Sequence, residues 1–283
     1  MHNYSKIVSI LLDSLPYIKI FRGSKIVIKY GGAAQINPEL KEQFAMDIVL
    51  LYMLGIKPII VHGGGKRINE LLGALKIESE FINGVRVTSA EALKVVEMVL
   101  SGEINKEITS FLNHHGVSAL GMSGKDASLF LAKPKENGKY GYTGEIIATK
   151  GEVIDNLLAQ NLIPVIAPIA YGGESGHPGF NINADSAASA IAIATKAKKA
   201  IFLTDTQGVL DANKNIIESL NLKETKQLIN EGVISGGMIP KVEACLECIT
   251  NGVEKAHIID GRIPHSLLLE LFTSAGIGSE FVR

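Results

Sequence analysis

Asparagine and aspartate side chains gather in the segment Asn181-Ile182-Asn183-Ala184-Asp185, directly before the small-residue run 186–197. Oxygen atoms of these side chains accept hydrogen bonds from the unpaired N–H groups at a helix N-terminus, so one interpretation is a simple helix cap. The alternative is that the segment forms part of a functional site. Taken alone it favours the cap, whereas lysines and glycines elsewhere in the chain favour the site.

Two lysines occupy positions that are unusual for a solvated side chain. Lys29 lies in the otherwise apolar segment 25–30, just before Gly31-Gly32, although a lysine in a strand usually lies at a solvated edge. Lys241 follows Gly237 by four residues, in the first turn of a predicted helix, where a cation opposes the helix dipole. Both positions indicate ammonium groups that serve a negatively charged ligand, with chance placement as the alternative.

Glycine turns follow two predicted strands, at 31–32 and at 63–65. A glycine turn between a parallel strand and a helix presents backbone N–H groups at the positive end of the helix dipole, which suits a phosphate. Parallel α/β proteins also need such turns for geometry, so the turns alone indicate little. The chain has no Walker-type phosphate loop, no clean G-x-G-x-x-G, and neither the His-Arg-Asp nor the Asp-Phe-Gly motif of protein kinases.

The composition is that of an ordinary globular protein, with 283 residues and room for one large α/β domain or two lobes. A net charge of -1 gives no reason to expect a nucleic acid or an anionic membrane as a partner. The segment 7–12 is too short for a signal peptide, and no apolar run approaches the ~20 residues that span a bilayer. We therefore expect a soluble, cytoplasmic protein.

The only cysteines, Cys245 and Cys248, lie three residues apart in a predicted helix. A C-x-x-C pair is typical of a redox site or of half a metal site, but neither a second pair nor a strand-to-helix redox context accompanies it. We interpret the two side chains as semi-buried thiols that behave as small hydrophobic groups, which fits a reducing compartment.

Strands and helices alternate along the chain, and repeated strand, glycine turn and helix is typical of parallel α/β construction. An amphipathic helix over 4–15, with Tyr4, Ile7, Leu11 and Leu15 at helical spacing, is predicted to end or kink at Pro16. Its apolar stripe covers either its own subunit or a neighbouring one. Strands are predicted at 25–30, 57–62, 117–120, 128–133, 140–148, 162–169, 199–203 and 256–259, and the main helices at 39–54, 66–75, 89–114, 153–160, 222–227 and 264–272.

Six motifs stand in the order found in the amino acid kinase family, which this chain resembles from about Lys25 to Arg283. They are Lys-Tyr-Gly-Gly at 29–32, His-Gly-Gly-Gly at 62–65, Asn-Gly-Val-Arg-Val-Thr at 83–88, Asn-Ile-Asn-Ala-Asp at 181–185, Thr-Asp-Thr-Gln-Gly at 204–208 and Gly-Gly-Met-Ile-Pro-Lys at 236–241. Each is weak alone, whereas six in order are specific. The motifs at 83–88 and 181–185 are similar to those of the branch that acts on N-acetyl-L-glutamate, rather than to carbamate, uridylate or aspartate kinases.

The resemblance implies a three-layer αβα sandwich around a mainly parallel open sheet, with two lobes. In this scheme residues 1–23 are an N-terminal helical extension for oligomerisation, 24–196 bind acetylglutamate and 197–283 bind the nucleotide. It also implies transfer of the γ-phosphoryl group of ATP, with Mg²⁺ bridging the phosphates, to the side-chain carboxylate of N-acetyl-L-glutamate, a step of arginine biosynthesis that leaves ADP. That carboxylate, with a pKa of ~4.3, is ionised at neutral pH, so the reaction needs fixed positive charge rather than a general base.

The resemblance assigns roles to individual residues. Lys29 and Lys241 flank the transferring phosphoryl group, and Gly32 and Gly64 offer it backbone N–H groups. Asp185 holds the two lysines in place. Arg86 binds the substrate α-carboxylate through two N–H donors, a bidentate contact that lysine copies poorly. The other expected site residues are Gly64, Gly65 and Asn181 for acetylglutamate, and Gly32, Asp205, Gly208, Ser235 and Gly237 for the nucleotide, with few direct protein ligands to the metal.

The N-terminal helix and the C-terminal segment 267–278 resemble those of arginine-inhibited family members, in which N-terminal helices interlace dimers into a hexamer. The resemblance implies that Glu270 and the region of Gly276 bind an arginine effector, although Glu270 also fits an ordinary exposed helix residue. A homo-oligomer is expected, either a dimer or a hexamer built as a trimer of dimers.

Two alternative functions remain. One is a sister kinase of the same family that acts on free glutamate, aspartate or a phosphomonoester, against which Arg86 and its motif argue. The other is a non-catalytic sensor of arginine or a nucleotide that retains the fold. The joint presence of Lys29, Asp185 and Lys241 argues against a sensor, because a sensor needs no cations that stabilise a transition state.

Overall fold

The computed structural model describes residues 2–82, 84–273 and 276–283, and within the first helix the side chains of residue 8 and of residues 12 onward. Asn83, which begins the Asn-Gly-Val-Arg-Val-Thr motif, lies outside the described residues, as do the side chains of Tyr4, Ile7 and Leu11. No helix in the described ranges is long and apolar enough to cross a bilayer.

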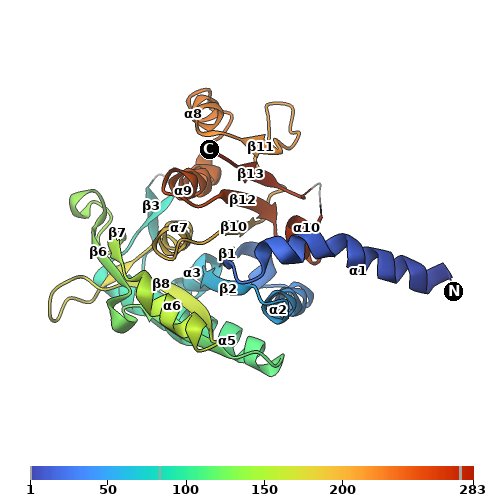
Figure 1. Ribbon diagram of the computed structural model, residues 1–283. Coiled ribbons are helices and arrows are strands. Elements are labelled where there is room, and N and C mark those ends of the chain that lie inside the picture. The colour runs from blue at the N-terminus through green and yellow to red at the C-terminus, as the bar shows by residue number, and fades with distance from the viewer. Residues whose placement is uncertain (1, 83, 274–275) are drawn as a thin grey trace.

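A nine-stranded, mainly parallel sheet forms the centre of the described structure (Figure 1). Its order is β11-β13-β12-β10-β1-β2-β8-β5, with β9 paired to β8. The six strands from β12 to β5 run parallel, whereas β13 and β9 are antiparallel to their neighbours β12 and β8. The strands are β1 Lys25–Tyr30, β2 Lys57–His62, β5 Ala119–Gly124, β8 Ile163–Ala170, β9 Phe180–Asn181, β10 Lys199–Thr204, β11 Ser219–Leu220, β12 Lys255–Asp260 and β13 Ser279–Phe281.

Helices cover both faces of this sheet, because its central strands are apolar on both sides. In β1, Val27 packs against one layer, while Ile26 and Ile28 pack against the other. The first layer contains α6 Gly151–Ala159, α7 Ala184–Ala194 and α9 Ile239–Thr250, with α8 Leu222–Asn230 beside α9. The second contains α2 Pro38–Met53, α3 Gly65–Ala74, α4 Ala90–Glu97, α5 Asn105–His114 and α10 Ser266–Phe272. The predicted three-layer αβα sandwich is confirmed.

The first helix differs from its prediction. Helix α1 runs from His2 to Phe21 and passes through Pro16, so it does not end there. Proline at this place removes the helical partner of the Leu12 carbonyl, but Pro16 and Leu12 are both exposed, and water can satisfy that carbonyl. The helix extends beyond the sheet layers and exposes Val8, Leu12, Leu15 and Ile20 (Figure 1).

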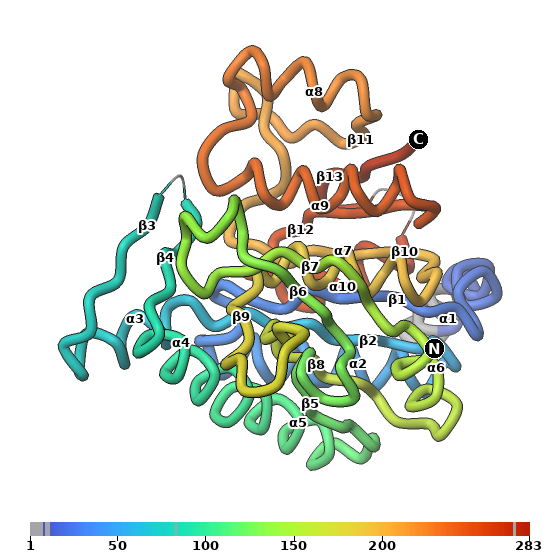
Figure 2. Tube along the Cα trace, turned by 90° about the vertical axis from the view of Figure 1, so that its left-hand side faces the viewer, coloured from blue at the N-terminus to red at the C-terminus, as the bar shows by residue number. Residues whose placement is uncertain are grey.

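Two other segments extend the predicted pattern. The helix expected over 89–114 contains a π-helical stretch, Met98–Ile104, between α4 and α5. The strands predicted at 128–133 and 140–148 form an antiparallel hairpin, β6 Phe130–Pro134 with β7 Gly144–Thr149. A second hairpin pairs β3 Glu80–Ile82 with β4 Val85–Val87. The two hairpins lie near each other (Figure 2), and a bridge between Thr88 and Gly141 connects the regions that follow β4 and β6.

The sheet continues without interruption across the predicted boundary between residues 196 and 197. Strand β1 pairs with β2 on one side and with β10 on the other, in the register Ile26 to Pro58 and Ile26 to Lys199. The α8–α9 region and the α3–α5 region lie at opposite ends of this sheet (Figure 2). The division into two lobes stays a prediction.

Candidate active site

A cleft of about 1130 Å³ opens beyond the carboxyl ends of β1 and β2, the usual place for a ligand in an open α/β sheet. Its walls bring together most of the predicted site residues, namely Lys29, Gly32, Gly64, Gly65, Arg86, Asn181, Asp185 and Asp205. Lys241 is joined to them through Asp185. Gly208, Ser235 and Gly237 lie outside the residues that form the walls.

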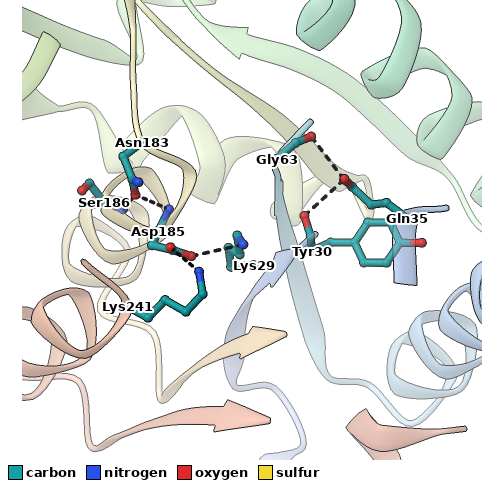
Figure 3. Close-up of polar contacts among 8 residues, drawn as sticks. All are labelled: Lys29, Tyr30, Gln35, Gly63, Asn183, Asp185, Ser186 and Lys241. Atoms are coloured by element: carbon teal, nitrogen blue, oxygen red, sulfur yellow. Dashed lines mark hydrogen bonds and ion pairs between the residues drawn. The ribbon is translucent and has the colours of Figure 1, made fainter. Parts of the chain in front are cut away.

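Three elements meet at a cluster of two ammonium groups and one carboxylate (Figure 3). The Lys29 Nζ atom lies 3.2 Å from Asp185 Oδ1, and Lys241 Nζ donates a hydrogen bond of 2.9 Å to Asp185 Oδ2. Lys29 comes from β1, Asp185 from the first turn of α7 and Lys241 from the first turn of α9. The predicted arrangement, one aspartate between two lysines, is the one observed.

The electrostatics of this cluster favour a further anion. Burial alone would raise the pKa of Asp185, but the attraction of Lys29 and Lys241 outweighs it and lowers that pKa. Burial lowers the pKa of Lys29, which Asp185 offsets only in part. With the carboxylate ionised, two cations face one anion, so an additional negative group would stabilise the buried ammonium of Lys29.

The helix-cap interpretation of the segment 181–185 is confirmed at Asn183, whereas its part in a functional site stays a prediction. Asn183 is the N-cap of α7, and its side-chain oxygen accepts hydrogen bonds from the N–H groups of Asp185 at 2.8 Å and Ser186 at 3.0 Å (Figure 3). This cap leaves the Asp185 carboxylate free to face the lysines. Asn181 belongs to β9 and donates to Thr88 Oγ1 at 3.2 Å.

Arg86 lies elsewhere on the cleft wall, in β4, and its surroundings contain no acid. One terminal nitrogen donates to Ser79 Oγ, and the other donates to Asn69 Oδ1 at 2.7 Å. The guanidinium carbon lies 4.6 Å from the centroid of the Phe81 ring. Arg86 is buried, which lowers its pKa, and no carboxylate in the described part of the chain forms a salt bridge with it. The charge is therefore available to an anionic ligand.

Sequence reasoning did not find Asn69, Ser79 or Phe81, the three side chains that hold Arg86. Asn69 follows Gly65 by four residues in α3, so it lies on the same helix face as the glycine turn, and this spacing was the available signal. Ser79 and Phe81 come from the β3 hairpin and its approach, where no periodic pattern points to the cleft.

Two glycines of the site are required by their neighbours. A side chain at Gly64 would begin 2.5 Å from Ile104 Cδ1 and 2.7 Å from Leu100 Cδ2, both in the π-helical stretch. Gly32 has a φ of +69°, and a side chain there would begin 2.3 Å from the Asp205 carboxylate. That carboxylate accepts a hydrogen bond of 2.6 Å from the Ala33 N–H. The close approach explains why both turns use glycine.

The residues predicted for the outer nucleotide site lie near the end of β10 and before α9. Gly208 packs against Ser279, and a side chain there would begin 2.7 Å from Ser279 Oγ. Ser235 and Gly237 are exposed, and nothing lies within 4 Å of the place of a side chain at Gly237. Their nucleotide role stays a prediction.

Glu270 is buried, so its description as an exposed helix residue was wrong. Its carboxylate lies 2.6 Å from His257 Nδ1 and accepts a hydrogen bond of 2.9 Å from the Ile277 N–H. Gly276 lies next to it, because a side chain there would begin 3.2 Å from Glu270 Oε2. The two residues are therefore neighbours, while their role toward arginine stays a prediction.

Cys245 and Cys248 are more deeply buried than the expected semi-buried thiols, because α9 packs them against α7 and the sheet. Burial raises the pKa of both thiols, that of Cys248 to about 12, which keeps them protonated. In the described ranges no group of three or more histidine, cysteine, aspartate or glutamate residues could hold a metal ion.

The model of the amino acid kinase family matches residues 24–260, most of the chain. The chain belongs to the amino acid kinase family. Among relatives, the protein is 69% identical to acetylglutamate kinase of Wolinella succinogenes over all 283 residues of both chains. It is 66% identical to acetylglutamate kinase of Helicobacter hepaticus, over 96% of this chain and 98% of that one.

Solved structures place this family member in the same fold group. N-acetylglutamate synthase from Neisseria gonorrhoeae, complexed with coenzyme A and N-acetyl-glutamate, matches with a TM-score of 0.87 at 25% identity. The match covers 98% of this chain and 63% of the synthase chain, so the synthase is the longer protein. Carbamate kinase from Giardia lamblia bound to AMP-PNP matches with a TM-score of 0.70 at 17% identity, over 92% and 99% of the two chains, which shows the shared fold.

Proposed function

We propose that this protein catalyses the ATP-dependent phosphorylation of the side-chain carboxylate of N-acetyl-L-glutamate, giving ADP and N-acetyl-L-glutamyl 5-phosphate. The main support is the cluster of Lys29, Asp185 and Lys241, which shares one cleft with the acid-free Arg86. Relatives that are 57–69% identical over nearly the whole chain are acetylglutamate kinases. The chain is therefore a phosphotransferase with a carboxyl group as acceptor.

The geometry suits a reaction between two anions. A carboxylate oxygen attacks the γ-phosphorus of ATP, a new P–O bond forms, and the bond to the β-γ bridging oxygen breaks, so that ADP leaves. No proton moves, because the attacking carboxylate is already ionised at neutral pH. Lys29 and Lys241 would stabilise the negative charge on the transferring phosphoryl group, and Asp185 would fix their positions.

Arg86 would orient the acceptor. A guanidinium has two parallel N–H donors that match a carboxylate, and burial without an acid partner makes an anionic ligand favourable. The α-carboxylate of N-acetyl-L-glutamate fits this position, while the side-chain carboxylate extends toward the lysines. Gly64, Gly65 and Asn181 would line the acetylamino-acid site.

The nucleotide would lie between the lysines and the segments 205–210 and 233–235, with Gly32 and Gly237 beside its phosphates. Mg²⁺ would neutralise phosphate charge and would be held mainly by phosphate oxygens and water. We also propose a cytoplasmic location, where ATP is available.

The decisive experiment measures ATP turnover with N-acetyl-L-glutamate and traps the acyl phosphate as its hydroxamate. We expect hydroxamate with N-acetyl-L-glutamate and much less with free glutamate or aspartate. A preference for a free amino acid would replace this proposal with the sister-kinase alternative. ATP binding without any hydroxamate would replace it with the sensor alternative.

We further propose that the protein is a homo-oligomer, either a dimer or a hexamer built as a trimer of dimers joined by α1. We also propose that arginine inhibits it near Glu270 and Gly276. The exposed apolar residues Val8, Leu12 and Leu15 of α1 support a subunit contact, because such residues favour burial. Deletion of residues 1–22 should leave active dimers, measured by light scattering. Hexamers that persist would contradict the role of α1, and turnover unaffected by millimolar arginine would contradict the inhibition.

A further inference from the structure

The peptide bond between Gly63 and Gly64 is held by two side chains that the proposed mechanism does not use. Gln35, at the end of the 3-10 turn Gly32–Gln35, donates from Nε2 to the Gly63 carbonyl at 3.2 Å. The ring nitrogen His62 Nδ1 lies 3.0 Å from the same carbonyl oxygen. The Gly63 carbonyl therefore has two side-chain donors, and the closure of the turn itself does not require both.

The protonation of His62 follows from its burial and from its contact with the Gly63 carbonyl. Asn105, which is fully buried, donates from Nδ2 to the carbonyls of Val165 at 2.9 Å and Met122 at 3.2 Å, and these acceptors fix the orientation of its amide. The same Nδ2 lies 3.2 Å from His62 Nε2, so its two hydrogens are shared among three acceptors. Burial lowers the pKa of His62 to about 4, so the ring is neutral. Because the Gly63 carbonyl can only accept a hydrogen bond, the one proton of the ring lies on Nδ1.

The proton on Nδ1 makes His62 the second side-chain donor to the Gly63 carbonyl, in addition to Gln35. A trans peptide is planar, with its C=O and N–H groups pointing in opposite directions. In Figure 3 the Gly63 carbonyl points to Gln35, away from Lys29 and Asp185. The N–H of Gly64 therefore points to the side of the lysine cluster, and it donates no hydrogen bond to any residue that the structure describes.

Other contacts hold the turn from its remaining sides. The Gly63 N–H donates to the Tyr30 carbonyl at 2.9 Å, and Gln35 Nε2 bonds that same Tyr30 carbonyl at 3.2 Å, which ties the ends of β1 and β2 together. Leu100 and Ile104 of the π-helical stretch occupy the space where a side chain at Gly64 would begin. A π-helical stretch is uncommon and frequently lies at a functional site.

We propose that Gln35 and His62 are positioning residues that lock the Gly63–Gly64 peptide and aim the Gly64 N–H at the reacting phosphoryl or acceptor oxygen. Asn105 acts one step further out, since its buried amide lies against His62 Nε2 and supports the ring from behind. This inference rests on the proposed kinase function and adds the residues that orient one of its backbone donors. A donor whose direction is fixed before the reaction needs no reorganisation in the transition state.

The test compares Gln35→Leu, His62→Leu and His62→Asn with the unaltered protein. His62→Asn keeps an N–H donor near the place of Nδ1, so we expect it to retain most of kcat. Gln35→Leu and His62→Leu should lower kcat by roughly 10-fold each, because the N–H remains but its direction is no longer fixed. The KM for ATP should stay within about 2-fold, since the lysine cluster is untouched.

Gln160→Leu is the matched control, because Gln160 is exposed at the end of α6, away from the cleft. Thermal unfolding of every variant separates positioning from stability. If Gln35→Leu and His62→Leu fold and turn over as fast as the unaltered protein, the positioning role is wrong. A fall in kcat that the His62→Asn variant shares with His62→Leu would equally contradict it.

A crystal structure of Gln35→Leu keeps this test independent of the proposed function. We expect the Gly63–Gly64 peptide to be rotated or present in two orientations, with the rest of the β2–α3 turn unchanged. An unaltered peptide in that variant would overturn the positioning role even in an active enzyme. Failure of the unaltered protein to form hydroxamate would instead overturn the kinase function, while a rotated peptide would still support the lock.

Discussion

The two cationic regions of the cleft are built in opposite ways. At the lysine region, Lys29 and Lys241 share the buried carboxylate of Asp185, so part of their positive charge is already balanced. At the arginine region, Arg86 is held by the neutral oxygens of Asn69 and Ser79 and by an aromatic ring, and its charge is not balanced.

The difference matches two kinds of anion. A permanent carboxylate on a substrate binds best to a cation that has no competing acid, which describes Arg86. A transferring phosphoryl group changes its charge distribution during the reaction, and it needs donors held in fixed positions rather than the strongest possible attraction to the ground state. An internal carboxylate that fixes two lysines supplies such donors. The arginine region should thus control KM, and the lysine region should control kcat.

The largest expected effect comes from Asp185→Asn. The change removes the carboxylate that balances the buried Lys29, and an uncompensated buried charge costs about 3–5 kcal/mol. We expect the free energy of unfolding, measured with denaturant, to fall by that order, together with a large loss of turnover. Asp155→Asn is the control, because it breaks the exposed pair between Lys25 and Asp155 and should cost less than about 1 kcal/mol.

The Asp185→Asn change should also alter how the free energy of unfolding depends on pH. The pKa of Asp185 is lowered in the folded protein, so its stabilising charge is fully present above the ordinary carboxyl pKa near ~3.9 and is lost as the pH falls through the folded value. Unfolding free energies measured below about pH 4 should fall more steeply in the unaltered protein than in Asp185→Asn. If the free energy of unfolding falls equally steeply with pH in both proteins, Asp185 is not responsible for this pH dependence.

Next in size is Lys241→Ala, which removes one donor while Asp185 keeps Lys29. We expect kcat to fall by roughly 100-fold or more, the scale for the loss of one electrostatic stabiliser, with little change in the KM for acetylglutamate. The hydroxamate assay measures both constants. Lys226→Ala, on the exposed side of α8, is the control. An unchanged kcat would remove Lys241 from the mechanism.

A smaller effect is expected from Arg86→Lys, which keeps the charge but loses the two-pronged geometry. The KM for acetylglutamate should rise roughly 10-fold, while kcat and the KM for ATP should change little. Steady-state kinetics with each substrate varied in turn gives these values. A rise in the KM for ATP instead would place Arg86 at the nucleotide and would remove the contrast between the two regions.

The smallest effect is expected from Asn69→Ala, which removes one neutral acceptor and leaves the charge of Arg86 in place. The KM for acetylglutamate should rise roughly 3-fold, in keeping with about 0.5–1.5 kcal/mol for one hydrogen bond. If the rise exceeds that of Arg86→Lys, Asn69 contacts the substrate itself rather than positioning Arg86.

The sequence was enough to predict the parallel α/β sheet and the residues of the lysine region. Apolar β-branched runs and glycine turns predicted β1, β2, β8 and β10. Lys241 was noticed because local rules disfavour a cation in the first turn of a helix, and the structure pairs it with Asp185. Six motifs in family order then supplied the roles.

The partners of these residues were harder to predict, because they come together only through the fold. Asn69 and Ser79 reach Arg86 from α3 and from the loop that follows it, and Glu270 turned out buried because His257 and Ile277 enclose it. The course of α1 through Pro16 was missed for a different reason. Because the helix is exposed, water can donate a hydrogen bond to the carbonyl that Pro16 leaves without a helical partner. A rule that considers only neighbouring residues does not predict whether a helix will be exposed.

The position of β1 between β2 and β10 has a consequence for how the chain folds. Ile26 pairs with Pro58 soon after it in the sequence, but its other partner, Lys199, is made more than a hundred residues later. During synthesis the edge of β1 that β10 will cover therefore stays open while most of the chain emerges, and open strand edges invite wrong pairing. Folding should be slow because of these long-range contacts, and the nascent N-terminal half is the part in greatest need of a chaperone.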